Sequence, residues 1–228
     1  MRKHAIALAL CAAVATAGTA RAETPREKAE GPGRKLADAT KVYRELITAS
    51  DKAIPKVLLE RAKCIAVLPG VIKAAIGFGG RHGSGVISCR TESGWSTPAF
   101  VSISGGSWGM QLGAESSDIV LFFMNDHGAR SLVKGSRVTL GGQASVAAGP
   151  FGRSAEAATN LELKAEIYSY AKSKGLFAGL SLEGARLTED KDDNSDYYGS
   201  GVISTQLLFG GGPATVPAEA RAFQQALP

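Results

Sequence analysis

Residues 77–85 read GFGGRHGSG, and this stretch decides the class of fold. Four glycines occupy alternate positions, at 77, 79, 83 and 85, and only Arg81 interrupts the series. Because alternate residues of a strand point to the same face, one face of this strand carries almost no side chains. Glycine there permits sharp curvature or the close approach of another backbone. The stretch therefore predicts a strongly curved antiparallel sheet, with a barrel-like form as the extreme case.

Short apolar runs separated by glycines and polar turns continue on both sides of this stretch, from Cys64 to Gly210. Such a pattern is typical of strands and turns. Residues 173–175, Ser-Lys-Gly, predict the turn of a hairpin. A short helix is expected from Asp126 to Lys134, with Asn125 as its cap. The prediction is an α+β fold whose sheet consists of short, glycine-rich strands.

Two helices are predicted ahead of the sheet, one at residues 34–49 and a shorter one at residues 54–62. The first is amphipathic, with charged residues on one side. Its apolar side consists of Leu36, Ala39, Tyr43, Leu46 and Ile47. This apolar stripe either docks on the protein's own sheet or lies on a membrane surface.

The first 22 residues have the features of a secretory signal peptide. Basic residues are followed by a short apolar run and by Ala20-Arg21-Ala22, which fits a cleavage site. Cys11, in the sequence LALC, leaves lipidation open as an alternative. Residues 23–33 predict a flexible lead-in, residues 34–212 a single domain and residues 213–228 a tail. We expect an exported protein of the periplasm or outer envelope, peripheral to the membrane.

The charge balance and the cysteines narrow the possibilities further. The chain has 26 basic and 21 acidic residues, and residues 1–22 contain three of the basic ones, so the remainder carries a net charge of +2. This balance gives no indication of a nucleic-acid partner. Two cysteines remain after cleavage, Cys64 and Cys89. In an oxidising compartment they favour a disulfide, and two separately buried thiols are the alternative.

One motif suggests catalysis. Residues 105–109, GGSWG, match the G-x-S-x-G elbow of serine hydrolases. That elbow needs a strand, a sharp turn and a helix, but no helical stripe follows Ser107. Candidate bases after residue 22 are limited to His82 and His127. The glycines are better explained by the backbone, and we expect no enzyme.

Two further motifs are incomplete. Residues 77–83 are spaced one residue off the dinucleotide-binding fingerprint, and no helix pattern follows them. The acidic run from Asp190 to Asp196 resembles the start of a calcium loop, but Ser195 stands at the position that requires glycine. A solvated acidic loop is the favoured interpretation, with weak calcium binding as the alternative. No cofactor is predicted.

Several stretches together resemble the SYLF domain, in the order typical of that family. They are AKCIAVLPGVIKAAIGFGGRHGSGV, GWSTPAFVSISGGSWGMQLGAESSDIVLFFM, VTLGGQASVAAGPFGR and SYAKSKGLFAGLSLEGARL, followed by YYG. The resemblance covers about residues 36–210. It implies a lipid-binding module, because eukaryotic members bind phosphoinositide-rich membranes through an amphipathic helix and basic residues, and some also bind and bundle actin. The chain is most similar in character to bacterial, exported members.

The resemblance also implies lipid-contacting residues. Lys35, Lys41 and Arg44 are candidate headgroup contacts on the first helix. Lys73 occupies the lysine position of the family motif V-x-K-A-x-x-G-x-G-G. Three aromatic residues could insert at the membrane interface or could belong to the core. They are Trp95, Trp108 and Phe100.

Cys64 and Cys89 depart from the family pattern, since the family usually has glycine at the first position and a plain apolar strand at the second. This departure suits an exported member with its own disulfide. The prediction is a non-catalytic module of the cell envelope that binds anionic phospholipid surfaces with phosphoinositide-type headgroups. The alternative is a structural or assembly protein that binds an envelope protein, and a serine hydrolase using Ser107 is a remote third. Because an envelope protein does not meet actin, actin is not expected as a partner.

Overall fold

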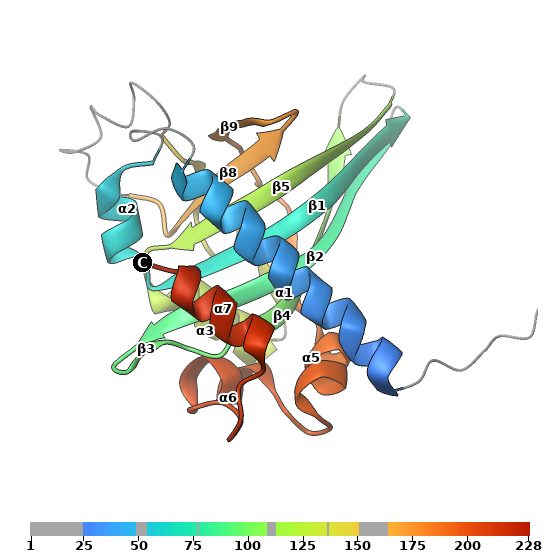
Figure 1. Ribbon diagram of the computed structural model, residues 1–228. Coiled ribbons are helices and arrows are strands. Elements are labelled where there is room, and N and C mark those ends of the chain that lie inside the picture. Colours follow the sequence, from blue (N-terminus) through green and yellow to red (C-terminus); the bar gives the residue numbers. More distant parts are fainter. Residues whose placement is uncertain (1–24, 49–53, 77, 109–112, 136, 151–163) are drawn as a thin grey trace, which may run out of the picture.

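The computed structural model describes residues 25–48, 54–76, 78–108, 113–135, 137–150 and 164–228. Within these residues ten strands form a strongly curled, half-barrel sheet with helices packed on it (Figure 1). The predicted α+β class, with a curved sheet and an N-terminal helix, is confirmed. The main path of the sheet runs β6-β10-β4-β2-β1-β5-β8-β7, while β3 pairs with β2 and β9 pairs with β8.

Every strand pair in the described residues is antiparallel except β7 with β8. The strands are β1 (Cys64–Ile76), β2 (Phe78–Thr91), β3 (Gly94–Trp95), β4 (Ala99–Trp108), β5 (Gly113–Phe123), β6 (Arg137–Thr139), β7 (Val146–Ala148), β8 (Ile167–Ser173), β9 (Leu176–Gly179) and β10 (Arg186–Glu189). The hairpin predicted at residues 173–175 joins β8 to β9. Lys174 and Gly175 both have positive φ there, as a tight hairpin turn requires.

The central strands are longer than predicted, because two apolar runs join into one strand. β1 passes through Pro69 and Gly70, where its pairing with both neighbouring strands shifts register. Gly70 has a φ of 59° and donates its N–H to Asp118 Oδ1 at 2.9 Å. An irregularity of this kind bends a strand without ending it. The Pro-Gly pair, which usually marks a turn, is a bend inside β1.

The glycine series of β2 packs against this bend. A Cβ added at Gly85 would lie 2.0 Å from the carbonyl oxygen of Val67, and one at Gly83 would lie 2.7 Å from Cγ2 of Val71. Real Cβ atoms do not approach so closely, so only glycine fits at these two positions. The close backbone approach predicted from the glycine pattern is therefore present.

Helices pack on both sides of the sheet. α1 (Pro25–Thr48) crosses one face, and α7 (Ala218–Ala226) lies beside it (Figure 1). α1 also contacts α5 (Lys191–Tyr198), and α2 (Lys56–Arg61) packs in the same layer. α3 (Asp126–Gly135) and α6 (Ser204–Phe209) pack on the other face. α1 thus begins within residues 23–33, the predicted lead-in, and α7 lies within residues 213–228, the predicted tail.

The two faces of the sheet bury two separate apolar clusters. The cluster under α1 and α7 includes Ile65, Val67 and Val120. The cluster on the opposite, inner face includes Ala66, Leu68 and other side chains that alternate with them. This alternation follows from the two-residue period of a strand. The middle of the sheet is therefore buried on both faces.

Candidate functional site

The inner side of α1 is docked on the sheet. Leu36, Ala39 and Leu46 are fully buried, Tyr43 is almost so, and only Ile47 of the predicted stripe is exposed. Burying a leucine side chain contributes roughly 1.5–3 kcal/mol, so exposing this stripe to a membrane would remove a large part of the protein's stability. Of the two roles considered for the stripe, docking on the protein's own sheet is the one observed.

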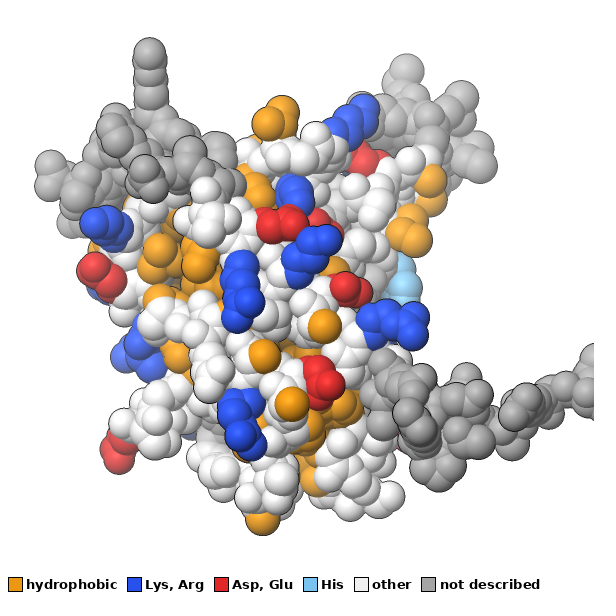
Figure 2. All heavy atoms as spheres, viewed as in Figure 1, with side chains coloured by type: hydrophobic (Ala, Val, Ile, Leu, Met, Phe, Trp, Pro, Cys, Tyr) orange, Lys and Arg blue, Asp and Glu red, His pale blue; other side chains and the backbone are white. Residues whose placement is uncertain are grey.

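The outer side of α1 carries exposed basic residues. Arg34, Lys41 and Arg44 all point away from the sheet, and Asp38 lies among them. Figure 2 shows this face, where Lys and Arg side chains are spread over α1 and its surroundings with acidic side chains between them. Lys41 and Arg44 are thus accessible to an anionic surface, as the predicted headgroup contacts must be.

Lys35 is not accessible in the same way. Its ammonium group forms a half-buried ion pair with Asp193 of α5, and this pair ties α1 to the C-terminal part of the chain. Burial raises the pKa of Asp193, although Lys35 acts in the opposite direction. The structure therefore places Lys35 in a structural contact between two helices rather than with Lys41 and Arg44.

The acidic run from Asp190 to Asp196 is helical rather than a loop. Asp190 caps α5 by accepting a hydrogen bond from the backbone N–H of Asp193 at 3.1 Å. Acidic side chains are favourable in the first turn of a helix, which explains their concentration here. Among the described residues, no group of three or more His, Cys, Asp or Glu side chains could hold a metal ion.

Two of the aromatic residues predicted for the membrane interface make contacts within the protein instead. Trp95 donates its indole N–H to the carbonyl oxygen of Pro228 at 2.7 Å, and the guanidinium of Arg90 lies 4.7 Å from its ring centre. Phe100 is fully buried and packs edge-on against Tyr197. These two aromatic residues therefore fix the C-terminal helices to the sheet. The side chain of Trp108 lies outside the described residues, although its backbone ends β4.

The backbone at Ser107 does not form a hydrolase elbow. β4 continues through this residue to Trp108, and Ser107 pairs with Gly79 of β2 in a regular antiparallel ladder. The sharp turn that would expose a nucleophile is therefore not located there. The side chain of Ser107 is outside the described part of the chain.

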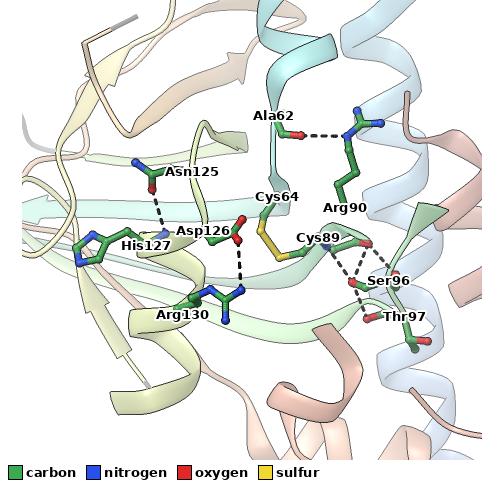
Figure 3. Close-up of a disulfide and its surroundings, with 11 residues drawn as sticks. Ala62, Cys64, Cys89, Arg90, Ser96, Thr97, Asn125, Asp126, His127 and Arg130 are labelled. Atoms are coloured by element: carbon green, nitrogen blue, oxygen red, sulfur yellow. Dashed lines mark hydrogen bonds and ion pairs between the residues drawn. A yellow bond between two sulfur atoms is a disulfide. The ribbon is translucent and has the colours of Figure 1, made fainter. Parts of the chain in front are cut away.

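Cys64 and Cys89 are joined by a disulfide, as predicted (Figure 3). They are directly opposite each other on β1 and β2, and both are buried. Beside the disulfide, the backbone N–H of Cys89 donates to Ser96 Oγ at 2.9 Å, and Arg90 donates to the carbonyl oxygen of Ala62 at 3.3 Å. The disulfide thus links β1 and β2 covalently at the end of the strands where both cysteines are buried.

A polar network around Glu166 lies at the same end of the sheet as the disulfide. The carboxylate of Glu166 accepts hydrogen bonds from the Asn125 amide at 3.1 Å and from the Ser145 N–H at 2.9 Å, and it contacts Nδ1 of His127. Asn125 also accepts from the backbone N–H of His127, the capping role that the sequence predicted for it. His127 is thus part of a structural network at the start of α3.

Lys73 lies at the opposite end of β1, in a cavity of about 300 Å³ on the inner face of the sheet. It is paired in register with Arg81 of β2 on one side and with Glu115 of β5 on the other. All three side chains line the cavity. Arg81 is not among the predicted site residues, although the sequence contains a signal for it, since Arg81 is the residue that interrupts the glycine series.

Comparisons with known proteins identify the family. The family Ysc84, described as Las17-binding protein actin regulator, matches residues 104–228, which is more than half of the chain. The chain therefore belongs to this family, and the predicted SYLF domain is confirmed. None of the described helices is both long enough and apolar enough to cross a bilayer.

Several eukaryotic relatives are similar over most of this chain. SH3 domain-containing YSC84-like protein 1 of Xenopus laevis is 40% identical over 179 residues, which are 75% of this chain and 53% of that protein. The human protein of the same name is 40% identical over 187 residues, 79% of this chain and 54% of its own length. Protein YSC84 of Saccharomyces cerevisiae is 39% identical over 180 residues, 75% of this chain and 38% of its own. The chain spans about half of the length of the first two and less of the third.

The comparisons correct one prediction. The expectation that actin is not a partner is contradicted, because the family is described as an actin regulator. A further yeast relative, 39% identical over 167 residues, is named LAS seventeen-binding protein 3. The family description and the name of this relative refer to binding and regulation rather than to a reaction. The exclusion of actin had rested on export, which depends on residues 1–22, outside the described residues.

Proposed function

We propose that this protein is a non-catalytic module that binds anionic phospholipid surfaces through the outer side of α1. The observation that carries the proposal is the arrangement of Lys41 and Arg44, which stay exposed on a helix whose other side is firmly docked. Because the backbone of a docked helix is already ordered, only the side chains lose conformational freedom on binding. Each basic residue near an anionic membrane contributes about 1 kcal/mol.

The docked helix favours adsorption over insertion. Apart from Ile47, its apolar stripe is buried in the core. Binding therefore depends on charge and must weaken as salt screens the surface. Among the described residues, the exposed large apolar side chains are Ile47, Ile72, Leu176 and Ile203, which lie in different parts of the chain. We therefore expect a reversible, peripheral association of the kind that anionic headgroups promote.

Vesicle co-sedimentation tests the proposal. The protein should bind vesicles that contain phosphatidylglycerol or phosphoinositide, bind neutral phosphatidylcholine vesicles much more weakly, and dissociate from the anionic vesicles at high salt. Equal binding to neutral and anionic vesicles, or no binding to either, would refute it. The same experiment with a phosphoinositide series would show which headgroup is preferred.

A second candidate function is supported by the family description. Because the family is described as Las17-binding and as an actin regulator, a protein partner of that kind is the alternative to a lipid. Co-sedimentation with purified actin filaments and pull-down with Las17 test this candidate. Neither the actin experiment nor the Las17 experiment depends on the vesicle experiment, so the lipid and protein candidates can be tested separately.

The predicted export and envelope location belong to the same set of proposals. They depend on cleavage after Ala22, which mass spectrometry of the protein recovered from its host would detect. An intact Met1 would remove the reason for placing the protein in an oxidising compartment, and it would make an actin-related partner easier to accommodate.

A further inference from the structure

On the inner face of the sheet, the side chains change from apolar to polar at corresponding positions of the neighbouring strands β1 and β5. Near the disulfide its side chains are apolar and buried, as at Leu68 and Leu121. Towards the other end β1 continues from Val71 to Lys73, and β5 continues from Ile119 to Ser117 and Glu115. Alternate residues share a face, so these polar groups extend the same inner surface beyond the core. The change produces a cavity that is apolar at its inner end and charged at its outer end.

Arg81 is the unusual group in this cavity. It is half-buried, and within the described residues neither Arg81 nor Lys73 forms an ion pair or hydrogen bond with a protein group. Burial lowers the pKa of the Arg81 guanidinium, which reflects the cost of holding its charge away from water. A guanidinium that is partly removed from water and has no partner provides a ready anchor for an anion.

The glycine series explains why the cations can be reached. Gly83, the next residue of β2 on the inner face, contributes no side chain beside Arg81. The neighbouring β8–β9 hairpin completes the cavity with Ala171 and Leu180. The site is thus built mainly from adjacent strands of the sheet.

The charge of the lining selects among anions. Two cations, Lys73 and Arg81, face a single carboxylate, Glu115, which already accepts a hydrogen bond from Ser173 Oγ at 2.6 Å. The net charge of +1 complements a singly charged phosphodiester better than a multiply charged phosphate. Arginine and hydroxyl groups suit phosphate oxygens, because the guanidinium fork can donate two parallel hydrogen bonds.

The apolar part of the lining indicates that the phosphate carries hydrocarbon. Val71 and Ile119 belong to the inner core cluster and form one wall of the cavity, and Leu180 packs against that cluster. A volume of about 300 Å³ lies at the lower end of the range for small-molecule sites. It can hold a headgroup and the beginning of an acyl chain, but not a whole two-chain lipid.

We propose that this cavity binds the phosphodiester headgroup of one anionic phospholipid, with Arg81 and Lys73 on the phosphate and Val71, Ile119 and Leu180 against the adjoining hydrocarbon. The inference rests on the proposed function for the class of ligand, a phospholipid, but it uses a different set of residues from the outer side of α1. It adds a defined site for a single lipid molecule to a surface that acts by charge.

Soluble short-chain lipids test the cavity without a membrane. Dihexanoylphosphatidylglycerol, below its micelle concentration, is titrated into the full chain by calorimetry or by NMR of the Ala171 and Ala178 methyl groups. We expect saturable binding with one molecule per chain. Glycerophosphoglycerol, which has the headgroup alone, and inorganic phosphate should each bind at least tenfold more weakly. Equal affinity for inorganic phosphate would overturn the assignment to a lipid.

Matched variants locate the site. The Lys73→Gln/Arg81→Gln variant should bind dihexanoylphosphatidylglycerol at least tenfold more weakly, and Arg81→Lys alone should weaken it severalfold because the fork is lost. Lys134→Gln/Arg137→Gln, with the same change of charge at exposed positions of α3 and β6, should leave the affinity for the soluble lipid within twofold. Thermal unfolding of each variant shows that the fold is retained.

The two proposals fail in different ways. No binding of the soluble lipid, or undiminished binding by Lys73→Gln/Arg81→Gln, overturns the cavity site even if anionic vesicles are bound. Saturable binding of the soluble lipid that depends on Arg81 supports the cavity site even if Lys41 and Arg44 prove unimportant on vesicles.

Discussion

The two halves of β1 belong to one strand but have different surroundings. From Cys64 to Leu68 every side chain is buried, because helices and neighbouring strands cover both faces. Beyond the bend at Gly70, Ile72 is 55% exposed and Lys73 is half-buried beside an open cavity. The comparison indicates that the two halves have different roles. The covered half stabilises the fold, and the open half is accessible to a ligand.

The largest effect on stability is expected at the disulfide. Replacing both cysteines, Cys64→Ala with Cys89→Ala, should lower the free energy of unfolding by about 3 kcal/mol, because the bridge closes a loop of 25 residues in the unfolded chain. Urea unfolding at equilibrium measures the difference. A change below about 1 kcal/mol would mean that the covered half does not depend on its covalent link.

A glycine in each half provides the next comparison. Gly85→Ala should destabilise the protein by about 2 kcal/mol, because its Cβ would collide with the backbone at Val67. Gly80→Ala, on the same strand but in the open half, should change stability by less than about 0.5 kcal/mol, since nothing lies within 4 Å. Thermal unfolding of the two variants checks this, and equal effects would contradict the division between the halves.

The Glu166 network should make part of the stability pH-dependent. Burial alone raises the pKa of Glu166, but hydrogen bonds from Ser145 and Asn125, together with His127, outweigh it and hold the pKa below its ordinary value. A depressed pKa stabilises the fold above the unfolded value, and this contribution is lost as the pH falls through the folded value. Glu166→Gln should therefore cost about 1 kcal/mol at pH 5 and less at pH 3. Urea unfolding at both values would contradict this if the difference stayed constant.

The smallest effect is expected in the cavity. Lys73→Gln/Arg81→Gln should change the free energy of unfolding by less than about 0.5 kcal/mol, because neither cation has a partner among the described residues. Differential scanning calorimetry without lipid checks this. A loss of more than about 1 kcal/mol would show that the two cations stabilise the fold and are not held in reserve for a ligand.

Much of the fold could be predicted because its signals are local. The glycine series of β2, the turn at residues 173–175 and the Asn125 cap all act within a few residues, and each is present in the structure. The length of β1 was missed because a Pro-Gly pair usually marks a turn, and only pairing with both neighbours shows that the strand continues.

The site was less predictable because its residues depend on contacts far apart in the sequence. Lys35 matched the pattern of an exposed helical lysine, but its partner Asp193 is 158 residues away. Trp95 is held by Pro228, 133 residues further on. Arg81 could have been recognised as the one side chain on a glycine face, yet its neighbours Lys73 and Glu115 become apparent only from the register of three strands.

The most direct test of the proposed lipid-binding function compares two charge-neutralised variants on vesicles containing phosphatidylglycerol. Lys41→Gln/Arg44→Gln removes two exposed cations from α1, whereas Lys134→Gln/Arg137→Gln removes two exposed cations from α3 and β6 on the other side of the sheet. Both keep residues 1–22, so any contribution of that segment cancels. At about 1 kcal/mol for each cation, the first should bind roughly 30-fold more weakly and the second should bind like the wild type. Equal affinities of the two variants would contradict a membrane-binding role for α1.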